Sequence, residues 1–127
     1  MKTLTLIFVL ILSATALNAA AFEKTATFRT TQVVYSAEQP LAVGTNTLDL
    51  ELTQKGEPVS DAKVTVKLFM PEMPGMPYME HIADAEPAGD GHYKATVSFA
   101  MPGTWQLHIF VETADGKKVR LKSSVNL

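Results

Sequence analysis

The 127-residue chain contains no cysteine. It can therefore form neither a disulfide nor a thiolate metal site, which are the usual supports of small exported domains. It also has no cysteine to carry a lipid, so we expect no lipid anchor. Any soft-metal chemistry in this chain has to rely on methionine and histidine.

Basic charge is also scarce, since 11 Lys and Arg face 13 Asp and Glu. The net charge of −2 offers no basic footprint of the kind that binds nucleic acid or anionic lipid. Catalytic motifs are missing too: there is no Gly-x-Ser-x-Gly, no Gly-rich phosphate loop, no His-Glu-x-x-His and no EF-hand spacing. We therefore expect a binding protein and not an enzyme.

The N-terminus has the pattern of a secretory signal peptide. Lys2 precedes an apolar run over residues 4–12, and residues 13–21 are mostly small and end in Ala-Ala-Ala. The run is shorter than the roughly 20 residues of a spanning helix. We predict export with cleavage after residue 21, which leaves one domain over residues 22–127; an uncleaved anchor is the alternative.

The rest of the chain alternates apolar and polar residues with a period of two, as half-buried strands do. No window shows a helical period. Short strands separated by Gly, Pro and Asp turns predict an antiparallel immunoglobulin-like β-sandwich of about seven strands. The predicted strands cover residues 27–36, 48–52, 63–70, 82–86, 92–99, 105–111 and 119–125.

The most unusual segment is Met70 to His81, the Met-Pro stretch, where Met opens each unit of a repeated tripeptide. Prolines at every third position exclude a helix and a central strand. In polyproline geometry, with three residues per turn, the methionines share one edge. A kink at Gly75 could then gather two or three thioethers. Thioether sulfur suits Cu(I) better than zinc, calcium or magnesium.

Copper is therefore the predicted cofactor, with Cu(I) favoured over Cu(II). The up-and-down strand order brings the turn after residue 99 to the same end as the Met-Pro stretch. His81, at the end of the Met-Pro stretch, would complete a Cu(I) site or supply a nitrogen ligand to Cu(II). The predicted ligands are Met73, Met76 and Met79, with Met70, His81 and Met101 as further candidates.

Other interpretations remain open at this stage. The methionines could fill gaps in the core, form an adaptable apolar contact for a partner, or sense oxidants as sulfoxides. Three acidic residues and a histidine near the next turn could bind a hard cation or Cu(II): Asp84, Glu86, Asp90 and His92. Strand parity makes Trp105 a core residue, with a cation–π contact to copper as the alternative, and makes His108 an outward surface residue.

Three segments resemble the YtkA-like and FixH-like domain family: residues 67–76, 91–97 and 103–107. The similarity extends over about residues 44–126. It implies a small exported β-sandwich linked to copper handling, in copper resistance and in cytochrome oxidase assembly. The residues that carry the family motif are Met70, Met73, Met76 and Met79, with Trp105 at a strand start.

Two departures shape the expected function. FixH proteins are membrane-anchored, whereas the cleavable signal here indicates a soluble periplasmic form. The His-Met spacing of chaperones that load oxidase is not reproduced, so resistance, buffering or handover is favoured over oxidase delivery. We expect a periplasmic copper-binding protein that meets a membrane efflux or oxidase-assembly complex. The alternative is a metal-free immunoglobulin-like accessory module that docks on such a complex.

Overall fold

The computed structural model describes residues 21–127. The predicted signal peptide, residues 1–21, lies almost wholly outside this range. Between residues 21 and 127 there is no helix with the length and apolar character needed to cross a membrane.

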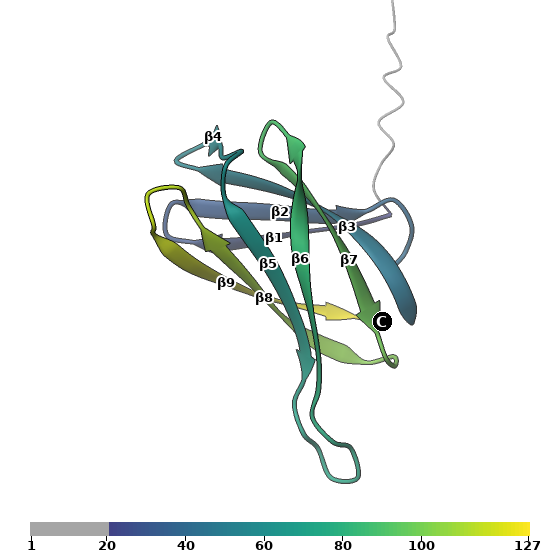
Figure 1. The fold of residues 1–127 in the computed structure, drawn as a ribbon. Helices are drawn as coiled ribbons and strands as arrows, with labels where there is room; N and C mark the ends of the chain where they lie inside the picture. The colour runs from purple at the N-terminus through teal and green to yellow at the C-terminus, as the bar shows by residue number, and fades with distance from the viewer. Residues whose placement is uncertain (1–20) are drawn as a thin grey trace, which may run out of the picture.

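The described chain is a succession of antiparallel strands joined by short turns (Figure 1). Each strand follows the two-residue alternation of the sequence, so one side chain in two faces inward. The strands are β1 (Phe22–Phe28), β2 (Thr31–Ala37), β3 (Gly44–Gln54), β4 (Glu57–Pro58), β5 (Lys63–Met70), β6 (Met79–Gly89), β7 (His92–Phe99), β8 (Thr104–Glu112) and β9 (Lys118–Asn126).

The strands form two packed sheets that share β6. One sheet has the order β1-β2-β3-β7, and the other has the order β5-β8-β9. β6 pairs with β5 from Met79 to Ala85 and then crosses to β7, which it pairs from Glu86 to Gly89 across a bulge. The β2-β3-β7-β6 and β5-β8-β9 orders are those of the two immunoglobulin sheets. The all-β sandwich prediction is confirmed.

A single apolar core lies between the sheets, and its largest buried side chains are Trp105, Tyr35, Tyr93 and Phe99. Both buried tyrosines have polar partners. Tyr35 shares a hydrogen bond with Ser123, and Tyr93 Oη donates to the Val59 carbonyl at 2.7 Å. Within residues 21–127 no buried side-chain polar atom lacks a partner, as a stable interior requires.

Two predicted boundaries are wrong. The segment 27–36 is not one strand, because the chain turns between β1 and β2 at Arg29, whose φ is 53°. Non-glycine residues rarely adopt positive φ, and no Gly or Pro marks this turn. The predicted strand 82–86 belongs to the longer β6.

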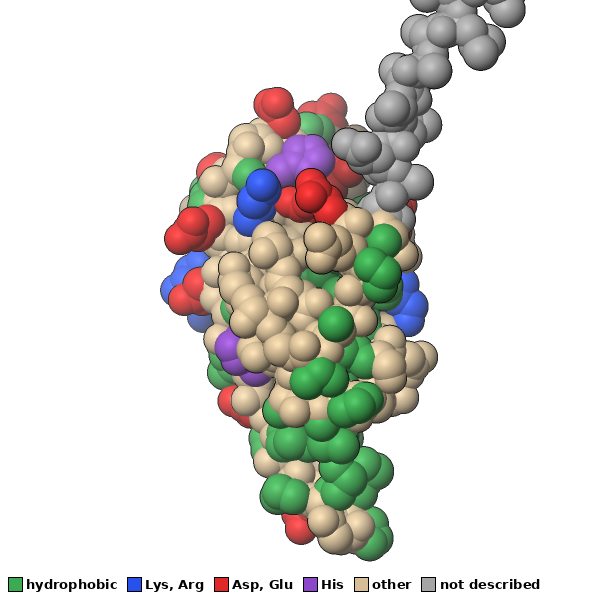
Figure 2. Space-filling view, turned by 90° about the vertical axis from the view of Figure 1, so that its right-hand side faces the viewer, with side chains coloured by type: hydrophobic (Ala, Val, Ile, Leu, Met, Phe, Trp, Pro, Cys, Tyr) green, Lys and Arg blue, Asp and Glu red, His purple; other side chains and the backbone are tan. Residues whose placement is uncertain are grey.

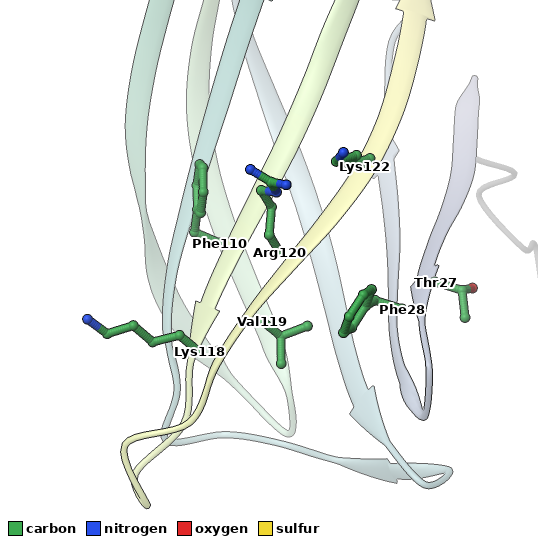
Figure 3. A pocket seen from close by; sticks show the side chains of 7 residues that line it. All are labelled: Thr27, Phe28, Phe110, Lys118, Val119, Arg120 and Lys122. Carbon is green, nitrogen blue, oxygen red and sulfur yellow. The ribbon is translucent and has the colours of Figure 1, made fainter.

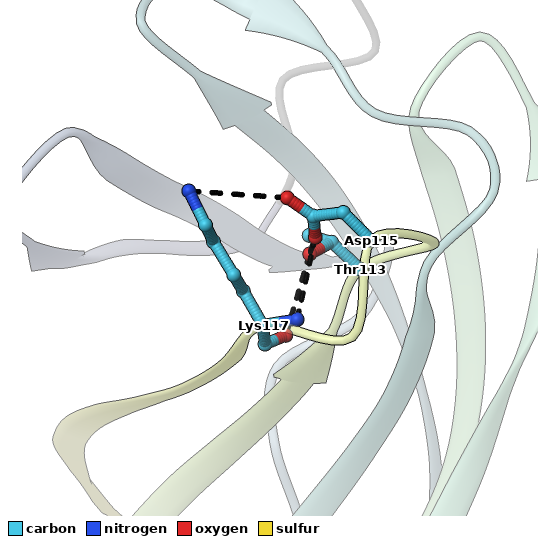
Figure 4. A network of polar contacts seen from close by, with 3 residues as sticks. All are labelled: Thr113, Asp115 and Lys117. Atoms are coloured by element: carbon cyan, nitrogen blue, oxygen red, sulfur yellow. Dashed lines mark hydrogen bonds and ion pairs between the residues drawn. The ribbon is translucent and has the colours of Figure 1, made fainter.

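The two ends of the sandwich differ in character. The β5–β6 and β7–β8 connections lie at one end, from which the β5–β6 connection projects well beyond the sheets (Figure 1). The opposite end carries the β6–β7 turn, with His92 beside it as predicted, and the β8–β9 turn. In the latter, Asp115 accepts hydrogen bonds from the Thr113 hydroxyl and the Lys117 amide (Figure 4).

Candidate metal centre

The projecting connection, Met70–His81, is a tight hairpin, which we call the Met-Pro hairpin. At its tip Met76 N donates to Met73 O at 2.8 Å, and Met73 N donates to Met76 O at 3.0 Å. Pro74 and Gly75 occupy the two central positions, and the φ of Gly75 is 81°. Proline followed by a positive-φ glycine is the sequence signature of a type II turn.

The hairpin replaces the straight methionine edge that polyproline geometry predicted. The chain reverses at Gly75, where a kink was expected, so the methionines face one another in pairs across the hairpin. Met73 pairs with Met76, and Met70 pairs with Met79 in the β5–β6 register. Directly opposed residues lie on the same face with Cβ atoms about 4.5–5.5 Å apart. Two flexible thioethers at that separation can reach one ion.

Met70 differs from the other methionines because it is buried. It is 2% exposed and belongs to the core. Its terminal methyl lies 3.1 Å from the position a Cβ would take at Gly103. This contact places the β7–β8 turn against the base of the Met-Pro hairpin. Met70 therefore packs the two connections together, and among the six predicted ligands it is the least accessible to a metal.

Three methionines lie at the boundary between core and solvent. Met76, Met79 and Met101 are partly buried and pack against the core, whereas Met73 is 46% exposed. Met101 stands in the β7–β8 turn, at the same end of the sandwich as the Met-Pro hairpin. The four side chains offer thioethers with graded access to solvent.

Trp105 supports this end from within the core. It is 1% exposed, and its ring meets Phe99 edge-on with centroids 5.7 Å apart. Its indole N–H donates to the Met101 carbonyl at 3.0 Å. The core role predicted from parity is thus the observed one, and the hydrogen bond holds the backbone of the β7–β8 turn in place.

His81 follows Met79 by two residues on β6, so the two side chains share one face of the strand. It is half-buried and lines an open groove with Thr47, Lys94 and Thr96. Between residues 21 and 127, His, Asp and Glu side chains nowhere form a group of three that could hold a metal. The alternative hard-cation site around Asp84, Glu86, Asp90 and His92 is therefore not formed.

Sequence reasoning missed a group of three polar side chains, Lys67, Tyr78 and Glu80, which we call the polar bracket. It lies on the face of the hairpin opposite to Met79. Tyr78 Oη donates to Glu80 Oε2 at 2.7 Å, and Lys67 Nζ lies 3.4 Å from the same oxygen. The hydrogen bond from Tyr78, aided by Lys67, lowers the pKa of the Glu80 carboxyl. Only the register of β5 against β6 brings Lys67 next to Glu80. The bracket keeps this negative charge on the face away from Met79.

The surface around the Met-Pro hairpin is apolar. Figure 2 shows hydrophobic side chains gathered over the projecting part of the molecule and the region next to it. Large apolar residues of this end stand well exposed: Met73, Tyr78, Ile82 and Val43. Glu72 and Glu80 add carboxylates to the hairpin, but its methionine donors are neutral and soft, and such donors favour a soft monovalent cation over a hard divalent one.

Comparisons with known proteins agree with this architecture. A search of curated proteins finds no match. A crystal structure of a DUF4426 family protein from Pseudomonas aeruginosa PAO1 is similar, with a TM-score of 0.55 and 15% identity over 83% of this chain and 94% of that one. At that identity the likeness concerns the fold alone. The model of the YtkA-like family matches residues 25–110, which span both sheets and the whole Met-Pro hairpin. The chain belongs to the YtkA-like family.

Proposed function

We propose that this protein binds Cu(I) through the Met-Pro hairpin and acts in the periplasm in copper resistance, buffering or handover. The observation that supports the proposal is the pairing of Met73 with Met76 across a tight turn. Thioethers are soft neutral ligands that need no deprotonation. The turn places two of them on one face before any metal arrives.

Met79 is the third ligand in this proposal. It lies at the base of the hairpin, opposite Met70, and is partly buried against the core. Met101 and His81 are further donors at the same end, and exchange among them lets a partner take the ion one ligand at a time. A membrane efflux or oxidase-assembly complex is the proposed recipient, and the signal-like residues 1–21 are the basis for the periplasmic location.

A competition titration tests the proposal. Residues 22–127, which contain every core residue of the described part of the chain, are titrated with Cu(I) under reducing conditions against a chromogenic chelator. Changing Met73, Met76 and Met79 to leucine keeps apolar bulk and removes sulfur, so we expect tight binding to be lost while the β-sheet circular dichroism is kept. Met70→Leu is the matched control: as a core residue it should leave Cu(I) affinity unchanged. Equal affinity of the triple variant and the original protein would end the proposal.

A second function has its own supporting observation. The exposed Tyr78 lies in the hairpin and the exposed Ile82 follows it on β6, and exposed apolar patches often mark protein–protein contacts. In that case the Met-Pro hairpin docks on a membrane complex without metal. Tyr78→Ser and Ile82→Ser would then abolish docking, whereas the leucine variants, which keep the apolar surface, would retain it. The copper proposal expects the opposite pattern for Cu(I) affinity: the leucine variants lose it, and the serine variants keep it.

A further inference from the structure

The last strand, β9, has one backbone edge that no other described strand pairs with. β9 pairs with β8 along one side, while β1, which lies beside its other side, pairs with β2. The two edge strands are linked where Lys24 Nζ donates to the Ser124 carbonyl at 2.6 Å. Towards the β8–β9 turn a groove opens between β1 and β9 (Figure 3).

The hydrogen-bond pattern of the β8–β9 hairpin identifies the backbone groups that face this groove. Thr113 N donates to Lys117 O at 2.9 Å, which makes these two residues a hydrogen-bonded pair. Hydrogen-bonded and non-hydrogen-bonded pairs alternate along an antiparallel ladder. Lys118, Arg120 and Lys122 therefore form non-hydrogen-bonded pairs with β8. Their N–H and C=O groups point away from β8, towards the groove.

The groove combines apolar and cationic side chains. Its volume is about 630 Å³. Phe28 from β1 and Phe110 from β8 line it and are 43% and 38% exposed. Lys118, Arg120 and Lys122 from β9 supply three positive charges, and none of the lining residues is acidic.

None of these three cations forms an ion pair within the described part of the chain, although Glu112 lies opposite Lys118 in the β8–β9 register. The ion pairs of residues 21–127 join Lys67 to Glu80 and Lys117 to Asp115, and neither involves a cation of the groove. A chain with a net charge of −2 thus concentrates three cations on one strand edge. Lysine on an edge strand repels a second copy of the same edge and so prevents self-pairing. The same charges attract a strand of opposite sign.

We propose that β9 accepts an acidic, extended peptide segment of a partner protein as an additional strand. Main-chain hydrogen bonds to Lys118, Arg120 and Lys122 supply affinity, as in other cases of strand addition to a sheet edge. Acidic side chains at alternate positions of the peptide lie beside Arg120 and Lys122 on the outer face. The intervening apolar side chains face Val119 and Phe28. This surface is separate from the Met-Pro hairpin, so it serves a docking role that does not depend on metal.

The probe is a dye-labelled octapeptide of alternating Glu and Val, added to residues 22–127 and followed by fluorescence anisotropy. We expect saturable binding that weakens with salt, and slower amide hydrogen exchange at Arg120 and Lys122 in the complex. Arg120→Gln with Lys122→Gln should weaken binding about tenfold. Lys94→Gln, on the outer face of the other sheet, is the matched control and should change nothing.

Three results would overturn the proposal. The first is absence of binding, or binding without protection of the β9 amides. The second is equal binding of a peptide N-methylated at alternate residues, since it would show charge attraction without strand pairing. The third is binding to phosphatidylglycerol vesicles with no binding of the peptide, which would make the cationic edge a membrane-facing surface.

Discussion

Replacing Gly75 by alanine measures how much the tight turn contributes to metal binding. The φ of Gly75 is 81°, a conformation that costs an L-residue about 1–2 kcal/mol. A Cβ at this position would meet nothing within 4 Å, so the substitution adds backbone strain and no clash. The hairpin tip projects beyond the sheets (Figure 1), with Met76 packed only partly against the core, and it can open to relieve the strain. Closing it again around a metal would then cost about 1–2 kcal/mol, which weakens Cu(I) affinity about 5- to 30-fold.

Gly116 is the matched control for this experiment. Its φ is 86°, a Cβ there also meets nothing within 4 Å, and it lies in the β8–β9 turn at the opposite end of the molecule. Gly116→Ala carries the same kind of strain without touching the Met-Pro hairpin. We expect it to leave Cu(I) affinity unchanged in the competition titration, while urea unfolding reports its effect on stability.

The reasoning fails if Gly75→Ala binds Cu(I) as tightly as the original protein. In that event the turn does not hold Met73 and Met76 in a binding arrangement, and their pairing is incidental to any metal site. It also fails if Gly116→Ala weakens Cu(I) binding as much as Gly75→Ala does. The loss would then reflect general destabilisation of the domain.

Three further predictions concern stability and are read by urea unfolding. Trp105→Phe removes the indole donor to the Met101 carbonyl and leaves part of a fully buried site empty, so it should cost about 2–3 kcal/mol; a loss below about 1 kcal/mol would contradict this core role. Gly91→Ala combines a φ of 78° with a Cβ 2.8 Å from Pro58 Cβ, so about 2–5 kcal/mol should be lost, and a near-neutral variant would contradict this packing. Burial and three nearby cations lower the pKa of His108. The folded state then binds this proton less readily than the unfolded state, so stability is full above about pH 6.5 and falls on acidification. His108→Gln should flatten the decline between about pH 7 and pH 5, and an unchanged slope would assign it to other groups.

Much of the sandwich could be read from alternation alone. The strands around Leu48, Val64, Tyr93, Trp105 and Leu121 were predicted because each buries every second residue, and all five residues are in the core. The β1–β2 turn was missed because Arg29 takes a positive φ without a glycine or proline to signal it. The arrangement of the methionines was mispredicted for a related reason. A three-residue repeat fits polyproline geometry, but its Pro74-Gly75 unit also encodes a turn, and β5–β6 pairing favours the turn.

The sequence by itself determined the chemical character of this protein: an all-β chain without cysteine whose soft donors are thioethers gathered in one short segment. Only the tertiary structure decided which thioethers are accessible, because burial depends on neighbours distant in the chain. Met70 is covered by the β7–β8 turn, whereas Met73 has no such neighbour. The cationic edge of β9 likewise cannot be found in a net charge of −2. A sum over the chain averages the charges, and strand pairing sorts them onto separate faces.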